Sequence, residues 1–232
     1  MKLHVTEWGE GPRTAVLIHG ITSEGATWGR VAPRLAERGY RVLAPSLRGH
    51  GPSPRGEYDP DGWASDLVET LDPQPDLAIG HSLGGIAVLL AAPVLRPGKA
   101  VYEDPAWFLG GGPHREQIAQ GFAAQKGWSR EQVAAANPRW PDADVDAKLA
   151  ALQSWDPETV HWIGPEGRDF TPDQPPVGPS LVVLADPSEL VPPAHAERLA
   201  ALGWEVRTVP GAGHSIHRDD LEGFLAALDG WV

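Results

Sequence analysis

A serine flanked by glycines is the residue of this sequence with the clearest potential for nucleophilic chemistry. Gly80-His-Ser-Leu-Gly84 follows the apolar run Leu77-Ala-Ile79 and precedes the apolar run Ile86-Ala-Val-Leu-Leu-Ala-Ala92. A Gly-x-Ser-x-Gly pattern between a strand and a helix is typical of a sharp, strained turn that exposes the serine hydroxyl, because the glycines let the two elements approach closely. We therefore predict that Ser82 is a nucleophile and not part of an ordinary glycine-rich turn.

A histidine must accept the proton of such a hydroxyl, because serine is a weak nucleophile without a neighbouring base. His214 ends the stretch Val209-Pro-Gly-Ala-Gly-His214, directly after the last apolar run of the sequence. A loop at that point would hold the imidazole over the carboxyl edge of a sheet, where open α/β sheets bind their ligands. We predict that His214 is the general base, with His217 as the alternative.

Short apolar runs alternate with helical patterns, and they predict the elements that position these two residues. Near-continuous apolar strands separated by helices are typical of a parallel sheet covered on both faces. The expected fold class is therefore α/β, with a mostly parallel central sheet flanked by helices. The expected strands are 14–19, 41–44, 77–79, 99–102, 180–185 and 205–209, and the expected helices outside residues 106–176 are 27–38, 63–71, 86–92 and 219–228.

The alternation stops between residues 106 and 176. Helical patterns there cover 116–124, 130–136 and 145–155, and a proline-rich link follows at 172–179. We predict an α/β core formed by 1–105 and 177–232, with a helical cap inserted at 106–176. The aromatic residues of the cap are expected to pack its interior and together to form an apolar roof. The three glycines 110–112 are either a hinge or a loose loop.

Three motifs in order resemble those of the α/β-hydrolase superfamily, over most of the chain outside the predicted cap. They are His19-Gly20 after a strand, Arg48-Gly-His-Gly51 after the next strand, and Gly80-His-Ser-Leu-Gly-Gly85. The resemblance implies the α/β-hydrolase fold in its serine esterase-like branch. It implies an oxyanion hole formed by the backbone N–H groups of Leu83 and Ile21. It also implies that His19 and His50 hold loop structure and take no part in catalysis.

The acid of a catalytic triad has several candidates. Asp186 follows the apolar run 181–184 in a segment that resembles the acid loop of the family, and it preserves the chain order serine, aspartate, histidine. The interval to the next Val-Pro pair is longer than the commonest form, which admits Glu189. Glu103 and Asp104 remain alternatives, because some branches of the family take the acid from an earlier strand. We predict Asp186.

These residues predict attack by Ser82, an acyl-enzyme, and hydrolysis by a water that His214 activates, with no cofactor. The expected substrates are carboxylic esters, with lactones and thioesters close in chemistry. The alternatives are a carbon–carbon bond hydrolase or hydroxynitrile lyase with the same triad, or a non-catalytic ligand-binding protein. The resemblance disfavours epoxide hydrolases and haloalkane dehalogenases, which use an aspartate at the nucleophile position.

Composition excludes several other classes. The formal net charge of −12 and the absence of any Lys/Arg run argue against nucleic acid as a partner. The chain has no cysteine, and its nine histidines show no zinc-type or calcium-loop spacing, so we expect no metal. Without a long apolar stretch or a secretory leader pattern, the expected location is the cytoplasm, with a small molecule as the partner. The oligomeric state is left open.

Overall fold

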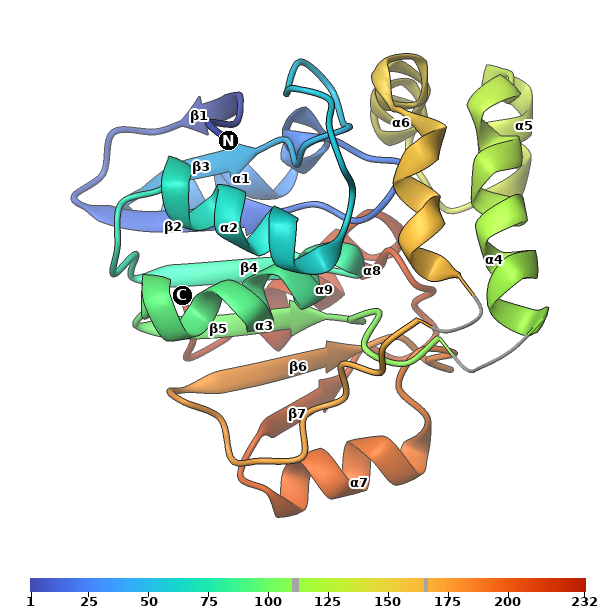
Figure 1. The fold of residues 1–232 in the computed structure, drawn as a ribbon. Coiled ribbons are helices and arrows are strands. Elements are labelled where there is room, and N and C mark those ends of the chain that lie inside the picture. The colour runs from blue at the N-terminus through green and yellow to red at the C-terminus, as the bar shows by residue number, and fades with distance from the viewer. Residues whose placement is uncertain (110–112, 165–166) are drawn as a thin grey trace.

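One mixed sheet organises the molecule (Figure 1). The computed structural model describes residues 1–109, 113–164 and 167–232, and within these ranges seven strands form a sheet of order β1-β3-β2-β4-β5-β6-β7. Only β1 runs antiparallel to its neighbour β3, and the other pairs are parallel. The predicted α/β class is confirmed. The strands are β1 Val5–Trp8, β2 Arg13–Ile18, β3 Tyr40–Pro45, β4 Leu77–His81, β5 Lys99–Glu103, β6 Ser180–Leu184 and β7 Glu205–Thr208.

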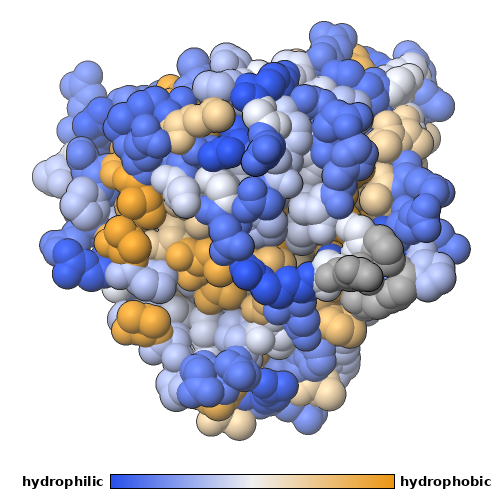
Figure 2. All heavy atoms as spheres, viewed as in Figure 1, coloured by the Kyte–Doolittle hydropathy of each residue, from blue (hydrophilic) through white to orange (hydrophobic). Residues whose placement is uncertain are grey.

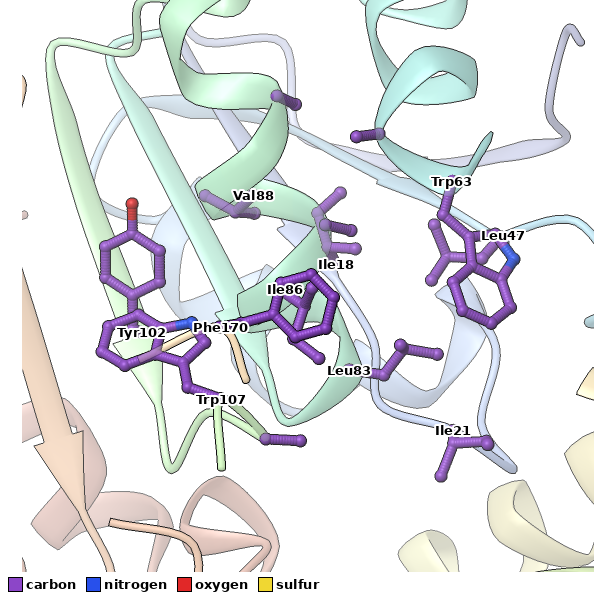
Figure 3. Close-up of a cluster of buried hydrophobic side chains, with 14 of the residues drawn as sticks. Ile18, Ile21, Leu47, Trp63, Leu83, Ile86, Val88, Tyr102, Trp107 and Phe170 are labelled. Carbon is purple, nitrogen blue, oxygen red and sulfur yellow. The ribbon is translucent and has the colours of Figure 1, made fainter. Parts of the chain in front are cut away.

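Two hydrophobic cores cover the two faces of the sheet. Because neighbouring strand residues point to opposite faces, Ile18 joins the core of α2, α3 and α7 while Leu17 joins the core of α1 and α9. The first core extends as far as Ile21 and Leu83, beside the site described below (Figure 3). The covering helices are α1 Val31–Ala36, α2 Pro60–Thr70, α3 Leu83–Leu95, α7 Pro193–Ala201, α8 Ile216–Asp219 and α9 Leu221–Ala227, and a short 3-10 turn η1 spans Gly25–Trp28.

The strand order creates a crevice between β2 and β4. These strands are neighbours, yet β2 is followed in the chain by β3 on one side, while β4 is followed by β5 on the other. The connections leaving the two carboxyl ends therefore diverge, and ligands of open α/β sheets bind at such a switch point. Ser82 follows β4 directly, and His19 follows β2 directly.

A helical segment lies between β5 and β6 in the chain and beside the carboxyl ends of the strands (Figure 1). Ser129 begins α5 with a reciprocal capping box to Gln132, and Arg130 pairs with Asp142 and Asp146 of α6. The predicted cap boundaries stay a prediction, and the predicted hinge at 110–112 lies outside the described residues. The elements are α4 Pro113–Ala124, η2 Gln125–Gly127, α5 Arg130–Ala136, α6 Asp142–Ser154 and η3 Pro157–Ile163.

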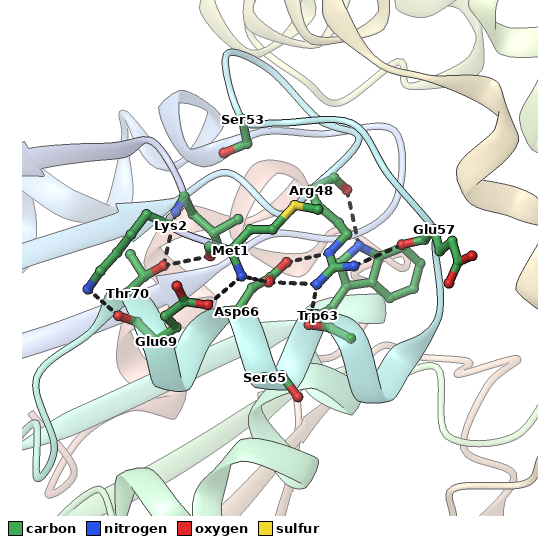
Figure 4. Close-up of polar contacts among 12 residues, drawn as sticks. Met1, Lys2, Arg48, Ser53, Glu57, Trp63, Ser65, Asp66, Glu69 and Thr70 are labelled. Carbon is green, nitrogen blue, oxygen red and sulfur yellow. Dashed lines mark hydrogen bonds and ion pairs between the residues drawn. The ribbon is translucent and has the colours of Figure 1, made fainter.

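A buried ion pair anchors the loop after β3 to α2 (Figure 4). The guanidinium of Arg48 binds both carboxylate oxygens of Asp66, whose side chain is fully buried, with Nη2 at 2.7 Å from Oδ1. The indole of Trp63 donates to the Arg48 carbonyl at 3.1 Å. The amino group of Met1 also binds Asp66. The Arg-Gly-His-Gly motif is thus held in place by contacts remote from Ser82.

The outer surface seen in Figure 2 is mostly hydrophilic, with hydrophobic residues in separate groups. Among the described residues, the exposed large hydrophobic side chains are Met1, Val94 and Val177. No helix in that part of the chain combines the length and the apolar character needed to span a membrane.

Candidate active site

Ser82 sits on a strained turn between β4 and α3. Its φ of 52° and ψ of −115° lie in a region that side-chain-bearing residues rarely adopt. A Cβ on Gly84 would lie 2.2 Å from the Ile18 carbonyl oxygen, and one on Gly80 would lie 2.4 Å from that of Gly84. Both glycines are therefore required for the close approach of strand and helix. The Ser82 N–H donates to the Glu103 carbonyl at 3.0 Å, which ties the turn to the end of β5.

A histidine–carboxylate pair lies at the same edge of the sheet. His214 Nδ1 lies 2.7 Å from Asp104 Oδ2. Asp104 is 1% exposed, while the His214 side chain is 41% exposed. The second oxygen of Asp104 accepts from the Ala185 N–H at 3.3 Å. A buried carboxylate on Nδ1 fixes the tautomer that leaves Nε2 free as a base.

The expectation that Asp186 pairs with His214 is wrong in this structure. Asp186 is exposed, and its Oδ2 accepts from the Gly211 N–H at 3.3 Å, so it binds the backbone of the loop that carries the histidine. Asp104 directly follows β5, which pairs with β4, whereas Asp186 follows β6, one strand farther from Ser82. Neighbouring strands are about 4.8 Å apart, so the earlier strand end is the nearer one. Asp104 is one of the alternatives that the sequence left open.

His217, the alternative base, is engaged on both ring nitrogens. Its Nδ1 lies 2.8 Å from the Glu103 carboxylate, and its Nε2 accepts from Arg218 Nε at 3.2 Å. The ring is buried and stacks on Trp28 at 4.3 Å between centroids. Neither ring nitrogen is free to accept a proton from a hydroxyl, so His214 remains the base candidate.

His81 lies beneath His214 and supports its backbone. Its Nε2 lies 3.1 Å from the His214 carbonyl oxygen, and the two rings lie 4.7 Å apart. Burial, with the nearby charges of His214, His217 and Arg218, lowers the pKa of His81 well below its ordinary value. A neutral His81 can therefore donate to that carbonyl and hold the loop.

His19 and His50 hold loops, as the family resemblance implied. His19 Nε2 accepts from the Leu47 N–H at 2.9 Å, and its Nδ1 donates to the Gly20 carbonyl at 2.8 Å. Burial lowers the pKa of His19 to about 4. His50 Nδ1 lies 3.1 Å from the Arg48 carbonyl oxygen, and burial lowers its pKa as well. Both rings stay neutral. His19 links the loops after β2 and β3, whereas His50 binds within the loop after β3 and packs edge-on against His19.

An apolar cavity of about 790 Å³ opens over Ser82 and His214. Ile21 and Leu83, the predicted oxyanion residues, both line it. Within the described ranges, the hydroxyl of Ser82 and the ring of His214 form no hydrogen bond with each other. Hydrogen bonds between a nucleophile and its base are often long until a substrate binds. The segment between β5 and β6 supplies Phe108, Leu109, His114, Ile118, Phe122, Trp162 and Ile163 to the wall.

A second, more polar cavity of about 430 Å³ adjoins the first. Both cavities include Ile21, Ser82, Phe122, Gly213 and His214 in their walls. Lys148 and Arg218 line only the polar one, and no sequence motif marked either residue. The described residues contain no cluster of three or more His, Asp or Glu side chains that could hold a metal ion.

Comparison with known proteins assigns the family. A model of the Alpha/beta hydrolase family matches residues 15–227. The chain belongs to the alpha/beta hydrolase family. This assignment supports a hydrolase, and the fold and strained serine turn agree with it.

The names of individual relatives describe different reactions. Lipase LipV of Mycobacterium tuberculosis is 37% identical over 63% of this chain and 60% of the lipase, so the chain spans less than two thirds of that relative. N-formylmaleamate deformylase of Pseudomonas putida KT2440 is 25% identical over 98% of this chain and 91% of its own. The crystal structure of an N-formylmaleamic acid deformylase from Pseudomonas putida S16 superposes with a TM-score of 0.79 at 26% identity, covering 97% of this chain and 95% of the other.

Proposed function

We propose that the protein is a serine hydrolase that cleaves carboxylic esters through an acyl-enzyme on Ser82. The observation that carries the proposal is the pair of His214 and buried Asp104 in the wall of the cavity that also contains the strained Ser82. Nucleophile, base and orienting carboxylate are the three parts that acyl transfer by serine requires.

The proposed reaction has two stages. Ser82 Oγ attacks the ester carbonyl while His214 Nε2 takes its proton, and the same imidazolium then protonates the leaving alcohol. A water molecule, deprotonated by His214, next attacks the acyl-enzyme and releases the acid. Asp104 stabilises the imidazolium in both stages through the 2.7 Å contact.

The backbone N–H groups of Leu83 and Ile21 are the proposed oxyanion donors. Leu83 is the first residue of α3, so its N–H has no acceptor within the helix and lies at the positive end of the helix dipole. One such donor is worth about 3–4 kcal/mol of transition-state stabilisation.

The nature of residue 82 argues against an epoxide or haloalkane substrate. A serine there cannot form the alkyl ester of a carboxylate on which those reactions depend. The helical segment at 106–176 is proposed to act as a cap, because eight of its residues wall the apolar cavity. An acyl or alcohol part with apolar character suits that wall.

The test is labelling with a fluorophosphonate probe together with turnover of short-chain p-nitrophenyl esters. The parent protein is expected to label and to hydrolyse the esters, and Ser82→Ala is expected to do neither. Ser53→Ala is the matched control, because Ser53 is also buried but lines neither cavity. An unlabelled parent, or a Ser82→Ala protein that labels as the parent does, would overturn the proposal.

A second candidate is cleavage of an amide-type C–N bond by the same three residues. The deformylase relatives, matched over nearly the whole chain, favour its inclusion. The same assay separates the two reactions when an N-formyl amide is offered beside the esters. Release of formate with a kcat/KM above that for every ester would favour the amide.

A further inference from the structure

Two buried basic side chains line the polar cavity, and no carboxylate of the described residues forms a salt bridge with either. Lys148 is 7% exposed and Arg218 is 3% exposed. Among the described residues, neither forms a salt bridge with an Asp or Glu side chain. A third cation in the wall, Arg139, is different because it pairs with Asp219 at 2.9 Å. The Arg218 guanidinium lies over the Trp140 ring at 4.6 Å, so among the described residues an aromatic face and neutral hydrogen-bond acceptors, and no carboxylate in direct contact, surround the two basic groups.

Carboxylates that act on Arg218 from a distance have partners of their own. Asp144 and Glu103 both raise the pKa of Arg218, although burial outweighs them and lowers it. Asp144 is bound by Arg30 at 2.7 Å. Glu103 is bound by the ring and the backbone N–H of His217. Glu103 reaches Arg218 only through the His217 ring, whose Nε2 accepts from Arg218 Nε, so neither carboxylate contacts the guanidinium directly.

The contacts of the two cations leave donors unused. Lys148 Nζ donates to the Thr22 carbonyl at 3.1 Å and to the Thr22 hydroxyl, which leaves one of its three N–H groups. Arg218 donates from Nε to His217 and from Nη2 to the Ser23 hydroxyl at 3.1 Å. Its Nη1 has no partner among the described residues.

Lys148 and Arg218 are two buried basic groups close enough for the charge of one to affect the other. Burial and the charge of Arg218 lower the pKa of Lys148 well below its ordinary value. A buried cation is normally paired with an anion, since removal from water costs several kcal/mol. A bound anion would restore that pairing for both side chains.

The polar cavity is close to the reaction centre, because it shares with the apolar cavity the walls formed by Ser82 and His214. A substrate whose carbonyl lies at Ser82 can therefore extend into both cavities at once. Gln125 and Asn137, also in the polar wall, add side-chain amides that can donate hydrogen bonds.

We propose that the polar cavity binds a carboxylate of the substrate through Lys148 and Arg218, so that the preferred substrates are esters with a free carboxylate near the scissile bond. This inference rests on the proposed ester hydrolysis. It deepens that function by giving the substrate a charge and by assigning each cavity a different part of the molecule.

The experiment measures a ratio of two kcat/KM values in the same protein. The acid-bearing substrate is mono-p-nitrophenyl glutarate and the neutral one is p-nitrophenyl pentanoate, with each rate corrected for its uncatalysed hydrolysis. A second pair, 3-acetoxypropanoate and propyl acetate, places the carboxylate on the alcohol side. In at least one pair, the parent is expected to favour the acid by about 10- to 100-fold, the range of charge-assisted hydrogen bonds.

Lys148→Met is expected to reduce that ratio by about 10-fold or more, mainly through a higher KM for the acid-bearing ester. Lys148→Arg, which keeps the charge, should restore part of it. The matched control is Lys126→Met. The Lys126 ammonium binds backbone carbonyls at the end of α6, and Lys126 lines neither cavity. The ratio of the two kcat/KM values should therefore stay at the parent value.

Each other outcome is decisive. A parent that hydrolyses neutral esters with a ratio near one in both pairs refutes the carboxylate site and leaves the proposed function intact. An equal loss on both esters in Lys148→Met also refutes it, and shows that Lys148 acts only by holding the Thr22 loop. A parent that turns over neither ester and does not label refutes the proposed function itself.

Discussion

Asp104→Asn separates the acid that the structure supports from the one that the sequence favoured. The substitution keeps the size of the side chain and removes its charge at a position that is 1% exposed. The new amide can still contact His214, but it cannot stabilise an imidazolium, and it favours the wrong tautomer of the ring when its NH₂ faces Nδ1.

The expected loss is large because the contact is short and buried. Removing the corresponding charge from a serine–histidine–aspartate triad lowers kcat about 10⁴-fold. That factor corresponds to about 5.5 kcal/mol of transition-state stabilisation. The comparison variant is Asp186→Asn, whose parent carboxylate is exposed and, among the described residues, accepts one 3.3 Å bond, from the Gly211 N–H. A hydrogen bond of that kind contributes about 1 kcal/mol or less, so its loss should lower kcat no more than about fivefold.

The assay is steady-state hydrolysis of a p-nitrophenyl ester, with fluorophosphonate labelling rates as a second readout. Circular dichroism and thermal unfolding of both variants show whether the fold is kept. A loss of about 10³-fold or more in Asp186→Asn, with near-parent activity in Asp104→Asn, would refute the assignment of Asp104. Equal small losses in both would show that His214 acts without a carboxylate partner.

Three further predictions concern stability. Gly84→Ala is expected to lower the melting temperature by about 10 °C or more, because the added Cβ would lie 2.2 Å from the Ile18 carbonyl oxygen. Gly121→Ala in α4 is the control: its Cβ would have no atom within 4 Å, so the change should be neutral or stabilise the protein by about 1 kcal/mol. Asp66→Ala should cost about 3–5 kcal/mol in denaturant unfolding, because it leaves the guanidinium of Arg48 without its buried partner. The pKa of His19 falls from 6.5 unfolded to about 4 folded, so its contribution to stability is complete above pH 6.5 and is lost as the pH falls toward 4. Between about pH 6.5 and 5 this histidine alone should remove about 1.5 kcal/mol, and an unfolding free energy that is constant over that range would contradict its burial in the neutral form.

Local patterns in the sequence were sufficient for the elements and for two of the three catalytic candidates. Strand patterns in the sequence predicted β2 to β7, and the signal is clearest for β4 and β6, which are buried at every position and therefore almost wholly apolar. The edge strand β1 was not predicted, although the edge strand β7, which is as little buried, was. Ser82 and His214 were found because the glycines around them report the tight backbone path on which each depends.

The carboxylate partner of His214 and the basic side chains of the polar cavity depend on contacts between segments far apart in the chain. Asp104 and His214 are 110 residues apart, and Lys148 and Thr22 are 126 apart. An aspartate at a strand end looks the same in sequence after β5 or β6. Strand order decides which strand end lies beside β4, and burial decides which carboxylate can bind an imidazolium strongly. The sequence by itself therefore determined the fold class and was enough to propose Ser82 and His214, whereas tertiary structure decided which carboxylate contacts His214 and which basic side chains lie beside it, because both are set by packing between distant elements.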